Sequence, residues 1–323
     1  MIIVGAGIIG LSCAWALART GRRVTIFDKG AAAREASWAG AGMLAPGGEF
    51  EADSEVARMA LRSLELYAAF VEELRRESGM QIDFRQCGAI EVGDEAALAR
   101  VAGLRAGLKI QSEACEYRGR AARFYPGDAL VDPRHVTEAL IVACRAHGVL
   151  VREHEPVIRI AVDGLSVETA HGRYADEGVL IAAGAWSSQL YPGLPQTRPV
   201  RGHLISYRMA PGFLGSIVRG GGTYVMQRSS GVVIAGSSTE DAGFEREIDE
   251  GVVADIARRA EALVPELRGV PIAERWNGLR PGIEGSGPVI GRVPGTAVYT
   301  AFGHYRNGIL LAPETGRMVA GLV

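Results

Sequence analysis

Apolar and polar positions divide the first thirty residues into three elements. Residues 1–4 form an apolar run that predicts a strand, and residues 11–18 form an apolar helical stretch that ends at Gly21. Residues 22–27 predict a second strand, and the acidic Asp28 follows it directly. The order strand, helix, strand predicts a βαβ unit and, with it, a parallel sheet.

Helical periodicity returns further along the chain. In residues 54–76, apolar side chains recur three and four positions apart with charged residues between them, which predicts an amphipathic helix. Asp132 stands directly before Pro133, an arrangement typical of a helix start, and Gly148 is suited to end that helix. The helices that these patterns predict are 54–76, 95–106, 133–147, 249–263 and a last one that follows Gly308.

Short β-rich runs alternate with these helices. We expect strands at 83–92, 149–152, 157–162, 165–169, 179–182 and 297–302. Residues 107–123 show no clear period, so no element is predicted there. Alternating runs at 202–209, 223–227 and 232–235 predict an antiparallel sheet. Because the two kinds of segment are interleaved, the pattern predicts an α/β fold whose domains are discontinuous in sequence.

Composition excludes several classes of protein. The 323 residues carry 35 basic and 37 acidic side chains, a formal net charge of −2, so no nucleic-acid partner is expected. With 48% hydrophobic and 22% charged residues, the chain has an ordinary globular composition. The 43 glycines have no collagen-like period, and their high share favours tight turns and close backbone approaches.

Cysteine usage and apolar stretches bear on the compartment. The four cysteines are widely spaced and form no Cys-x-x-Cys pair, so we expect neither structural zinc nor a disulfide framework. Residues 1–18 are uncharged but lack the basic start of a signal peptide. Residues 178–197 are also uncharged, but prolines and polar side chains interrupt them, so no transmembrane helix is expected. The sequence therefore predicts a cytoplasmic protein without a bound metal or a membrane partner.

The junction after the first strand carries a dinucleotide-binding pattern. Gly5 permits a tight turn, Gly7 lets the backbone approach a pyrophosphate, and Gly10 lets the helix pack closely on the strand. Asp28, at the end of the next strand, is suited to accept hydrogen bonds from ribose hydroxyls, which disfavours the 2′-phosphate of NADP. The alternative is a glycine-rich turn in an unrelated α/β fold.

Three further motifs carry a more specific signal. They are residues 37–46 (SWAGAGMLAP), residues 276–281 (WNGLRP) and residues 303–313 (GHYRNGILLAP). Together with the glycine motif at residues 5–10, they resemble the D-amino-acid oxidase superfamily and, within it, the bacterial glycine oxidases of thiamine biosynthesis. The resemblance extends over the whole chain. A plain NAD-dependent dehydrogenase explains residues 1–28 but not the other motifs.

The resemblance implies a two-domain flavoenzyme. It places a discontinuous Rossmann-type FAD-binding domain at 1–80, 131–197 and 276–323, and a discontinuous α+β substrate-binding domain with an antiparallel sheet at 81–130 and 198–275. FAD is expected to be bound non-covalently, because the C-terminal-region cysteine that anchors the flavin in the sarcosine oxidase branch is absent from this sequence. A homo-oligomer is also implied, with a homotetramer as the family precedent.

The chemistry that the resemblance implies is amine oxidation. Members of the superfamily oxidise an amine at the carbon that bears hydrogen, pass a hydride to N5 of the flavin and pass electrons on to dioxygen. For glycine, the implied products are the imine or, after hydrolysis, glyoxylate, with ammonia and hydrogen peroxide; sarcosine and D-alanine are further expected substrates. In thiamine biosynthesis the imine itself is used for the thiazole, so a partner enzyme is expected to intercept it.

Two rival functions stay open. One is a FAD-dependent D-amino-acid dehydrogenase that passes electrons to a quinone, which membrane-surface features would favour. The other is a flavin-binding protein without turnover that acts as a structural partner. No basic amphipathic helix is evident in the sequence, which disfavours the first rival.

Three side chains are implied to handle the substrate. Arg280, in the motif at 276–281, is suited to clamp an amino-acid carboxylate because a guanidinium is a permanently charged, fork-shaped donor. Arg306 is the second cation expected near the flavin; a surface charge at a helix start is the alternative. Tyr224 lies on a predicted strand and is expected to hydrogen-bond the same carboxylate; a core tyrosine is the alternative.

The implied FAD contacts come from both ends of the chain. Small residues after Ser37 are expected to run along the isoalloxazine ring, and the start of the last helix is expected to stabilise negative charge on the reduced flavin. The implied FAD-binding residues are Gly5, Ala6, Gly7, Ile8, Ile9, Gly10, Asp28, Lys29, Ser37, Ala39, Gly40, Gly42, Met43, Val157, Ala183, Gly184, Trp186, Gly303, His304, Arg306, Asn307, Gly308 and Ile309. Two positions depart from the family pattern: Asp28 replaces the more usual glutamate, and His203 stands where many relatives carry glutamine, so no role is assigned to it.

Overall fold

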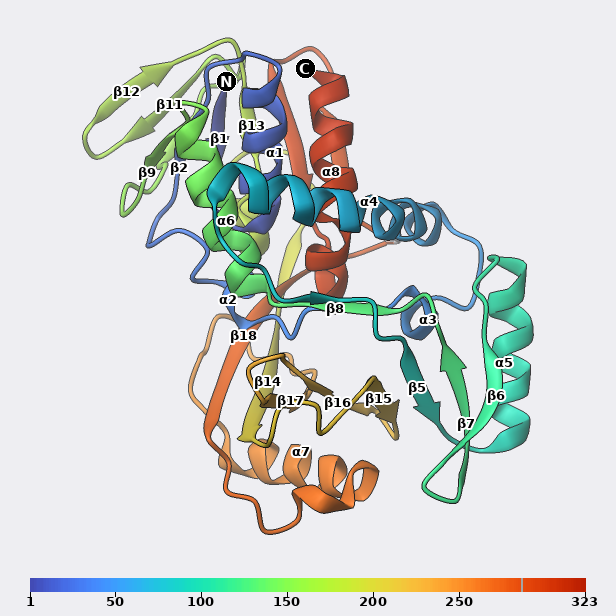
Figure 1. Cartoon of the computed structure of the whole chain (residues 1–323). Helices are drawn as coiled ribbons and strands as arrows, with labels where there is room; N and C mark the ends of the chain where they lie inside the picture. The colour runs from blue at the N-terminus through green and yellow to red at the C-terminus, as the bar shows by residue number, and fades with distance from the viewer. Residues whose placement is uncertain (286) are drawn as a thin grey trace.

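The computed structural model describes residues 1–285 and 287–323, and the chain forms two large sheets (Figure 1). The smaller of the two has the strand order β19-β20-β13-β1-β2-β9, and all its neighbours are parallel except β19 and β20. Its strands are β1 (Ile2–Val4), β2 (Thr25–Phe27), β9 (Leu150–Arg152), β13 (Val179–Ile181), β19 (Val289–Arg292) and β20 (Val298–Phe302). The predicted βαβ start and parallel sheet are confirmed.

Three of four long helices contact this six-stranded sheet, and the fourth packs on two of them (Figure 1). The four helices are α1 (Ile8–Arg19), α4 (Glu55–Ser78), α6 (Pro133–Ala146) and α8 (Gly308–Leu322), of which α4 packs on α6 and α8. α1 packs against α6 and α8, and Gly316 of α8 permits the close approach, since a Cβ there would lie 2.9 Å from the carbonyl oxygen of Ser12. As predicted, Asp132 caps α6, where its carboxylate accepts a hydrogen bond from the backbone N–H of Arg134 at 2.9 Å.

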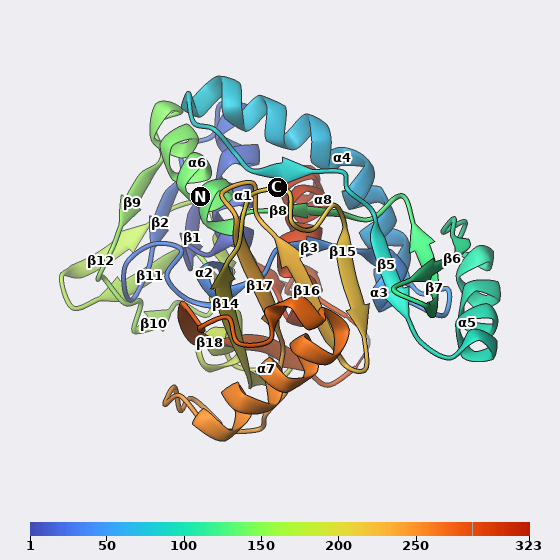
Figure 2. The same cartoon turned by 60° about the horizontal axis from the view of Figure 1, so that its bottom comes forward.

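The second large sheet has eight strands in the order β18-β14-β17-β16-β15-β5-β7-β6, antiparallel except between β15 and β5. Its strands are β5 (Ala89–Val92), β6 (Glu113–Tyr117), β7 (Arg120–Tyr125), β14 (Thr197–Arg208), β15 (Ile217–Gly220), β16 (Thr223–Gln227), β17 (Val232–Gly236) and β18 (Glu274–Ile283). Figure 2 shows α7 (Glu250–Leu263) in front of β14, β16 and β17, which it contacts, and α5 (Glu95–Gly107) beside β7. The predicted antiparallel sheet is confirmed.

Two small antiparallel sheets and several short helices complete the fold. One sheet contains β10 (Arg159–Ile160), β11 (Ser166–Thr169) and β12 (Gly172–Ala175), and the other contains β3 (Met43–Leu44), β4 (Phe84–Arg85) and β8 (Ala129–Val131). The short helices are α2 (Ala36–Ala39), α3 (Pro46–Glu49), η1 (Gly184–Gln189), η2 (Pro265–Leu267) and η3 (Tyr305–Asn307). In the described part of the chain, no helix has the length and apolar character needed to cross a membrane.

Some sequence-based expectations are wrong in detail. The single strand expected at 83–92 is two strands in different sheets, because Gly88 adopts a φ of 67° and turns the chain between β4 and β5. The stretch with no predicted element holds the hairpin of β6 and β7. Most residues of β6 are exposed, so burial imposes no alternation of apolar and polar residues there.

Strand pairing crosses one expected domain boundary. β18 pairs with β14 from Thr197↔Ile283 to Ser206↔Glu274. Residues 276–283 therefore belong to the eight-stranded sheet by hydrogen bonding, although the sequence predicts them to be part of the FAD-binding domain. The division into two domains stays a prediction. The pairing itself matters for the site, because it carries Arg280 to the edge of a large cavity.

Candidate active site

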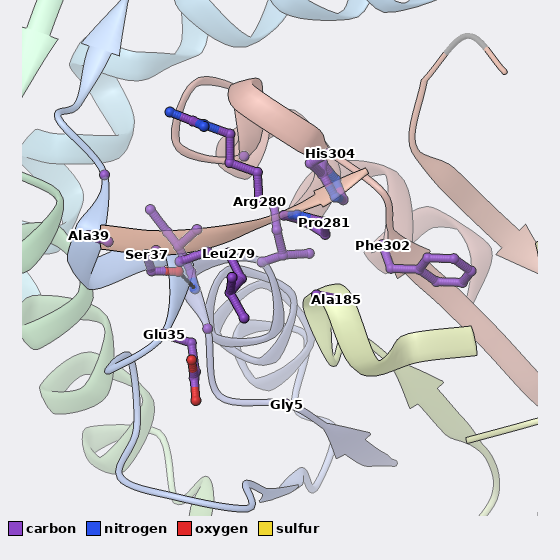
Figure 3. A pocket seen from close by; sticks show the side chains of 18 of the residues that line it. Gly5, Glu35, Ser37, Ala39, Ala185, Leu279, Arg280, Pro281, Phe302 and His304 are labelled. Atoms are coloured by element: carbon purple, nitrogen blue, oxygen red, sulfur yellow. Dashed lines mark hydrogen bonds between the residues drawn. The ribbon is translucent and has the colours of Figure 1, made fainter. Parts of the chain in front are cut away.

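A pocket of about 380 Å³ lies where the two large sheets meet. Its walls come from the β1–α1 junction, the segment around α2, the turn after β13, strands β14, β16 and β18, and the start of α8. Figure 3 shows labelled residues from five of these segments around one cavity, among them Gly5, Ser37, Ala185, Arg280 and His304. Segments from both ends of the sequence thus build one site.

The β1–α1 junction forms a glycine cradle. Gly5 has a φ of 110°, and a Cβ there would lie 2.4 Å from the carbonyl oxygen of Ala182. A Cβ at Gly10 would lie 1.9 Å from the carbonyl oxygen of Gly5, so the helix starts against the turn itself. Gly7 is the N-cap of α1 and offers no side chain to cap it, which leaves amide donors of the first turn for an anionic ligand.

Two side chains accept hydrogen bonds from backbone N–H groups of the cradle. Ser37 lines the pocket and accepts a hydrogen bond from the backbone N–H of Ile8 at 2.9 Å. The carboxylate of Asp28 accepts from the backbone N–H groups of Ala6 at 2.7 Å and Gly30 at 2.9 Å. Burial raises the pKa of Asp28, and these two hydrogen bonds oppose the rise. Asp28 thus stands in the wall of the pocket in the place expected for a ribose contact.

A cation covers an aromatic ring near Asp28. Nζ of Lys29 lies 3.2 Å from the ring centroid of Trp186 and 3.3 Å from the Glu35 carboxylate. Burial lowers the pKa of Lys29, and the nearby Arg246 guanidinium acts in the same direction. Lys29, Trp186 and Glu35 all line the pocket, so an ion pair and an aromatic ring lie beside the cradle.

Arg280 is the site's partly buried cation without an acidic partner. Its Nη1 donates to the carbonyl oxygen of Ser238 at 3.0 Å, and its Nη2 donates to Oγ of Ser237 at 2.8 Å. Among the residues that the structure describes, no carboxylate forms an ion pair with it, in contrast to most arginines of this chain. Burial lowers the pKa of Arg280, and Arg306 adds to this effect. A guanidinium in this state is suited to bind an anion.

Tyr224 and Arg306 lie on the same pocket but differ in their surroundings. Tyr224 is buried on β16, and burial raises its pKa, so the phenol stays protonated and able to donate. Arg306 is exposed and pairs with Glu49 at 3.2 Å. Arg306 thus has an acidic partner, whereas Arg280 has none among the described residues.

The start of α8 closes the pocket from another side. Asn307, Gly308 and Ile309 line it, and Asn307 forms no side-chain cap on the helix. The neighbouring His304 is buried, and its Nε2 lies 3.0 Å from Oγ1 of Thr315. Burial lowers the pKa of His304 to about 3, so the imidazole is neutral. The first residues of α8 therefore line the cavity next to a neutral imidazole.

Every residue expected in the site lines this pocket except Ala6, Gly10 and Gly303. Gly10 and Gly303 are instead required by the local backbone and packing. Gly303 has a φ of 82°, and a Cβ there would lie 2.9 Å from the Ile283 side chain. The individual roles stay predictions. Ser237, Glu49 and Gly202 also line the pocket but were missed, because none of them belongs to a motif.

The fold and the pocket define a dinucleotide-binding α/β protein whose ligand cavity borders a second, antiparallel sheet. The family described as FAD dependent oxidoreductase matches residues 1–322, and the chain belongs to this family. It is an enzyme, and its cofactor is FAD. The residues present fit that group, because Gly5 and Gly7 line the pocket without side chains at the start of α1, where a pyrophosphate would bind, and the Asp28 carboxylate lines the same pocket, where a ribose would bind.

Several known proteins match this chain over nearly its whole length. The glycine oxidase of Geobacillus kaustophilus is 33% identical over 345 residues, which cover 99% of this chain and 92% of the relative. The glycine oxidase of Pseudomonas aeruginosa is 32% identical, with 100% and 94% covered. The crystal structure of the Geobacillus kaustophilus glycine oxidase has a TM-score of 0.94, with 32% identity, and 99% and 93% covered. The bifunctional protein ThiO/ThiG of Synechocystis is 31% identical, and the match covers 100% of this chain but 51% of the relative.

Proposed function

We propose that this enzyme oxidises glycine, and also sarcosine and D-alanine, with dioxygen as the electron acceptor. The observation that carries the proposal is the guanidinium of Arg280, which lines the FAD pocket without an acidic partner among the described residues. The names of the relatives at 33% and 32% identity support glycine as the substrate. The overall reaction converts glycine, dioxygen and water into glyoxylate, ammonia and hydrogen peroxide.

In this proposal, the chain's own residues bind and orient the substrate. The fork of Arg280 binds the carboxylate, and the phenol of Tyr224, which burial keeps protonated, donates to the same group. FAD, when bound, supplies the acceptor for the hydride that leaves the α-carbon. Amides at the start of α8 stabilise negative charge that develops near them. No side chain is needed as an obligatory base.

The imine product suggests a place in a reaction sequence. The relative named ThiO/ThiG supports the proposal that a second enzyme uses the glycine imine to synthesise the thiazole of thiamine. An imine hydrolyses in water, so an enzyme that uses it must capture it quickly. We also propose that the enzyme is cytoplasmic and a homo-oligomer of two-domain subunits; gel filtration would test the oligomer and limited proteolysis the two domains, while cell fractionation would test the compartment.

The experiment is peroxide release from a panel of amines under air. Glycine, sarcosine and D-alanine should each yield peroxide, and anaerobic mixing with glycine should bleach the yellow protein until oxygen is admitted. Recovery with a quinone but not with oxygen would favour the dehydrogenase rival. No bleaching with any amine would rule out both enzymatic proposals. Acid precipitation should also release all the colour, because the proposed FAD is non-covalent and no cysteine of the described chain lines the pocket.

A further inference from the structure

A polar network connects Arg280 to β14 through residues 237–240. Both acceptors of the Arg280 guanidinium, the Ser237 hydroxyl and the Ser238 carbonyl, belong to this short segment. The Ser238 hydroxyl donates to Oε1 of Glu240 at 2.5 Å and accepts from the backbone N–H of His203 at 2.7 Å. The position of the guanidinium therefore depends on where this segment is held.

Glu240 fastens the segment to β14. Its Oε2 accepts from both Nε and Nη2 of Arg201, at 3.1 and 2.7 Å. Its Oε1 also lies 2.7 Å from Nδ1 of His203. The backbones of Arg201 and Glu240 exchange two further hydrogen bonds, at 3.0 and 2.9 Å. Glu240 thus uses both carboxylate oxygens and its main chain to keep the segment in place.

His203 is fully buried, and its two ring nitrogens have distinct roles. The backbone N–H of Asp249 donates to Nε2 at 3.2 Å, so Nε2 must be the unprotonated nitrogen. The proton then sits on Nδ1, which donates to Glu240. Asp249 is also the N-cap of α7, where its carboxylate accepts from two backbone N–H groups. The imidazole therefore links the start of α7 to Glu240.

We propose that Glu240 and His203 are positioning residues for Arg280. They hold Ser237 and Ser238 so that these two residues orient the guanidinium toward the substrate carboxylate. The inference rests on the proposed function of Arg280. Neither Glu240 nor His203 lines the FAD pocket, so each acts through Arg280 rather than on the substrate or the flavin.

The test compares two neighbouring carboxylates by binding and by kinetics. Glycolate, a small carboxylate without an amine, is titrated into the FAD-loaded enzyme by calorimetry, and KM and kcat are measured with glycine. Glu240→Gln should weaken glycolate binding about tenfold and raise KM similarly, with kcat within about threefold. Asp241→Asn is the matched control, because its exposed carboxylate meets only the exposed Arg198 at 3.7 Å; it should leave all three quantities unchanged.

A double mutant separates positioning from a general structural effect. In an Arg280→Ala background, Glu240→Gln should cause no further loss of glycolate affinity, since its effect passes through Arg280. Additive losses, or a Glu240→Gln variant that behaves like Asp241→Asn, would overturn the inference. If Arg280→Ala alone leaves glycolate affinity unchanged, the proposed function fails instead.

A second variant covers the case in which Glu240→Gln does not fold. Ser238→Ala removes the hydroxyl that donates to Glu240 and accepts from the backbone N–H of His203, and it leaves Glu240 paired with Arg201 and His203. It should also weaken glycolate binding in the parent and not in the Arg280→Ala background. Unchanged binding in the parent would overturn the inference.

Discussion

The guanidinium of Arg280 lies directly against Gly202 of the neighbouring strand. A Cβ at position 202 would come within 2.0 Å of Nη1 and 2.3 Å of Nη2. Since Gly202 has no left-handed φ, the requirement for glycine is one of space and not of backbone conformation. The atoms in the way are the far end of a flexible side chain, so a methyl group there would displace the guanidinium and leave the strand intact.

Gly202→Ala should therefore impair substrate binding more than folding. We expect roughly a tenfold loss of glycolate affinity, equivalent to about 1.4 kcal/mol, and a Tm within a few degrees of the parent. Gly291→Ala, on strand β19 with open space around the added Cβ, is the control and should bind normally. Normal glycolate affinity in Gly202→Ala would contradict the assignment of Arg280 as the carboxylate receptor.

Arg280→Ala tests the receptor itself. Loss of a charge pair with the substrate carboxylate should cost about 2 to 5 kcal/mol of binding, while FAD affinity stays unchanged. Arg275→Ala removes an exposed arginine of the same strand, paired with Glu250, and should have no such effect. An Arg280→Ala affinity for glycine and glycolate within about threefold of the parent, about 0.6 kcal/mol, would refute the assignment.

Turnover and inhibitor binding should depend differently on pH. Glycine must react as the free amine, because an ammonium group lacks the lone pair that stabilises the developing iminium, so kcat/KM should rise with pH. Glycolate binding should stay flat from about pH 6 to 9, because arginine remains charged and burial raises the pKa of Tyr224. If glycine turnover and glycolate affinity changed with pH in the same way, the carboxylate-binding groups themselves would titrate, and the prediction would be wrong.

His304 should make the fold sensitive to acid. Burial lowers its pKa from 6.5 to about 3, so in that interval the unfolded chain binds a proton that the folded chain does not. The free energy of unfolding must then fall as the pH falls through this window. In saturating FAD, His304→Gln should lose stability less steeply than the parent between about pH 7 and 4. The exposed His171→Gln is the control, and equal slopes for all three proteins would argue against a buried neutral imidazole.

Much of the FAD cradle could be predicted because its determinants are adjacent in the chain. The order of β1, α1 and β2 follows from apolar periodicity over thirty residues, and one glycine of the junction is required by an atom only five residues away, whereas Gly5 meets the distant Ala182. Gly10, for example, is required by the carbonyl of Gly5. The start of α8 and the cap at Asp132 were predictable for the same reason, since helix ends are determined locally.

The amino-acid sequence by itself thus determined the βαβ start, most helices and the residue types of the FAD cradle. Only the tertiary structure decided which residues surround Arg280. β14 and β18 pair across some seventy intervening residues, and that pairing sets Gly202 beneath the guanidinium and residues 237–240 around it. Neither Ser237 nor Glu240 belongs to a periodic pattern or a motif. Their partners are chosen by strand register and by the need to satisfy buried polar groups, and both of these depend on contacts distant in sequence.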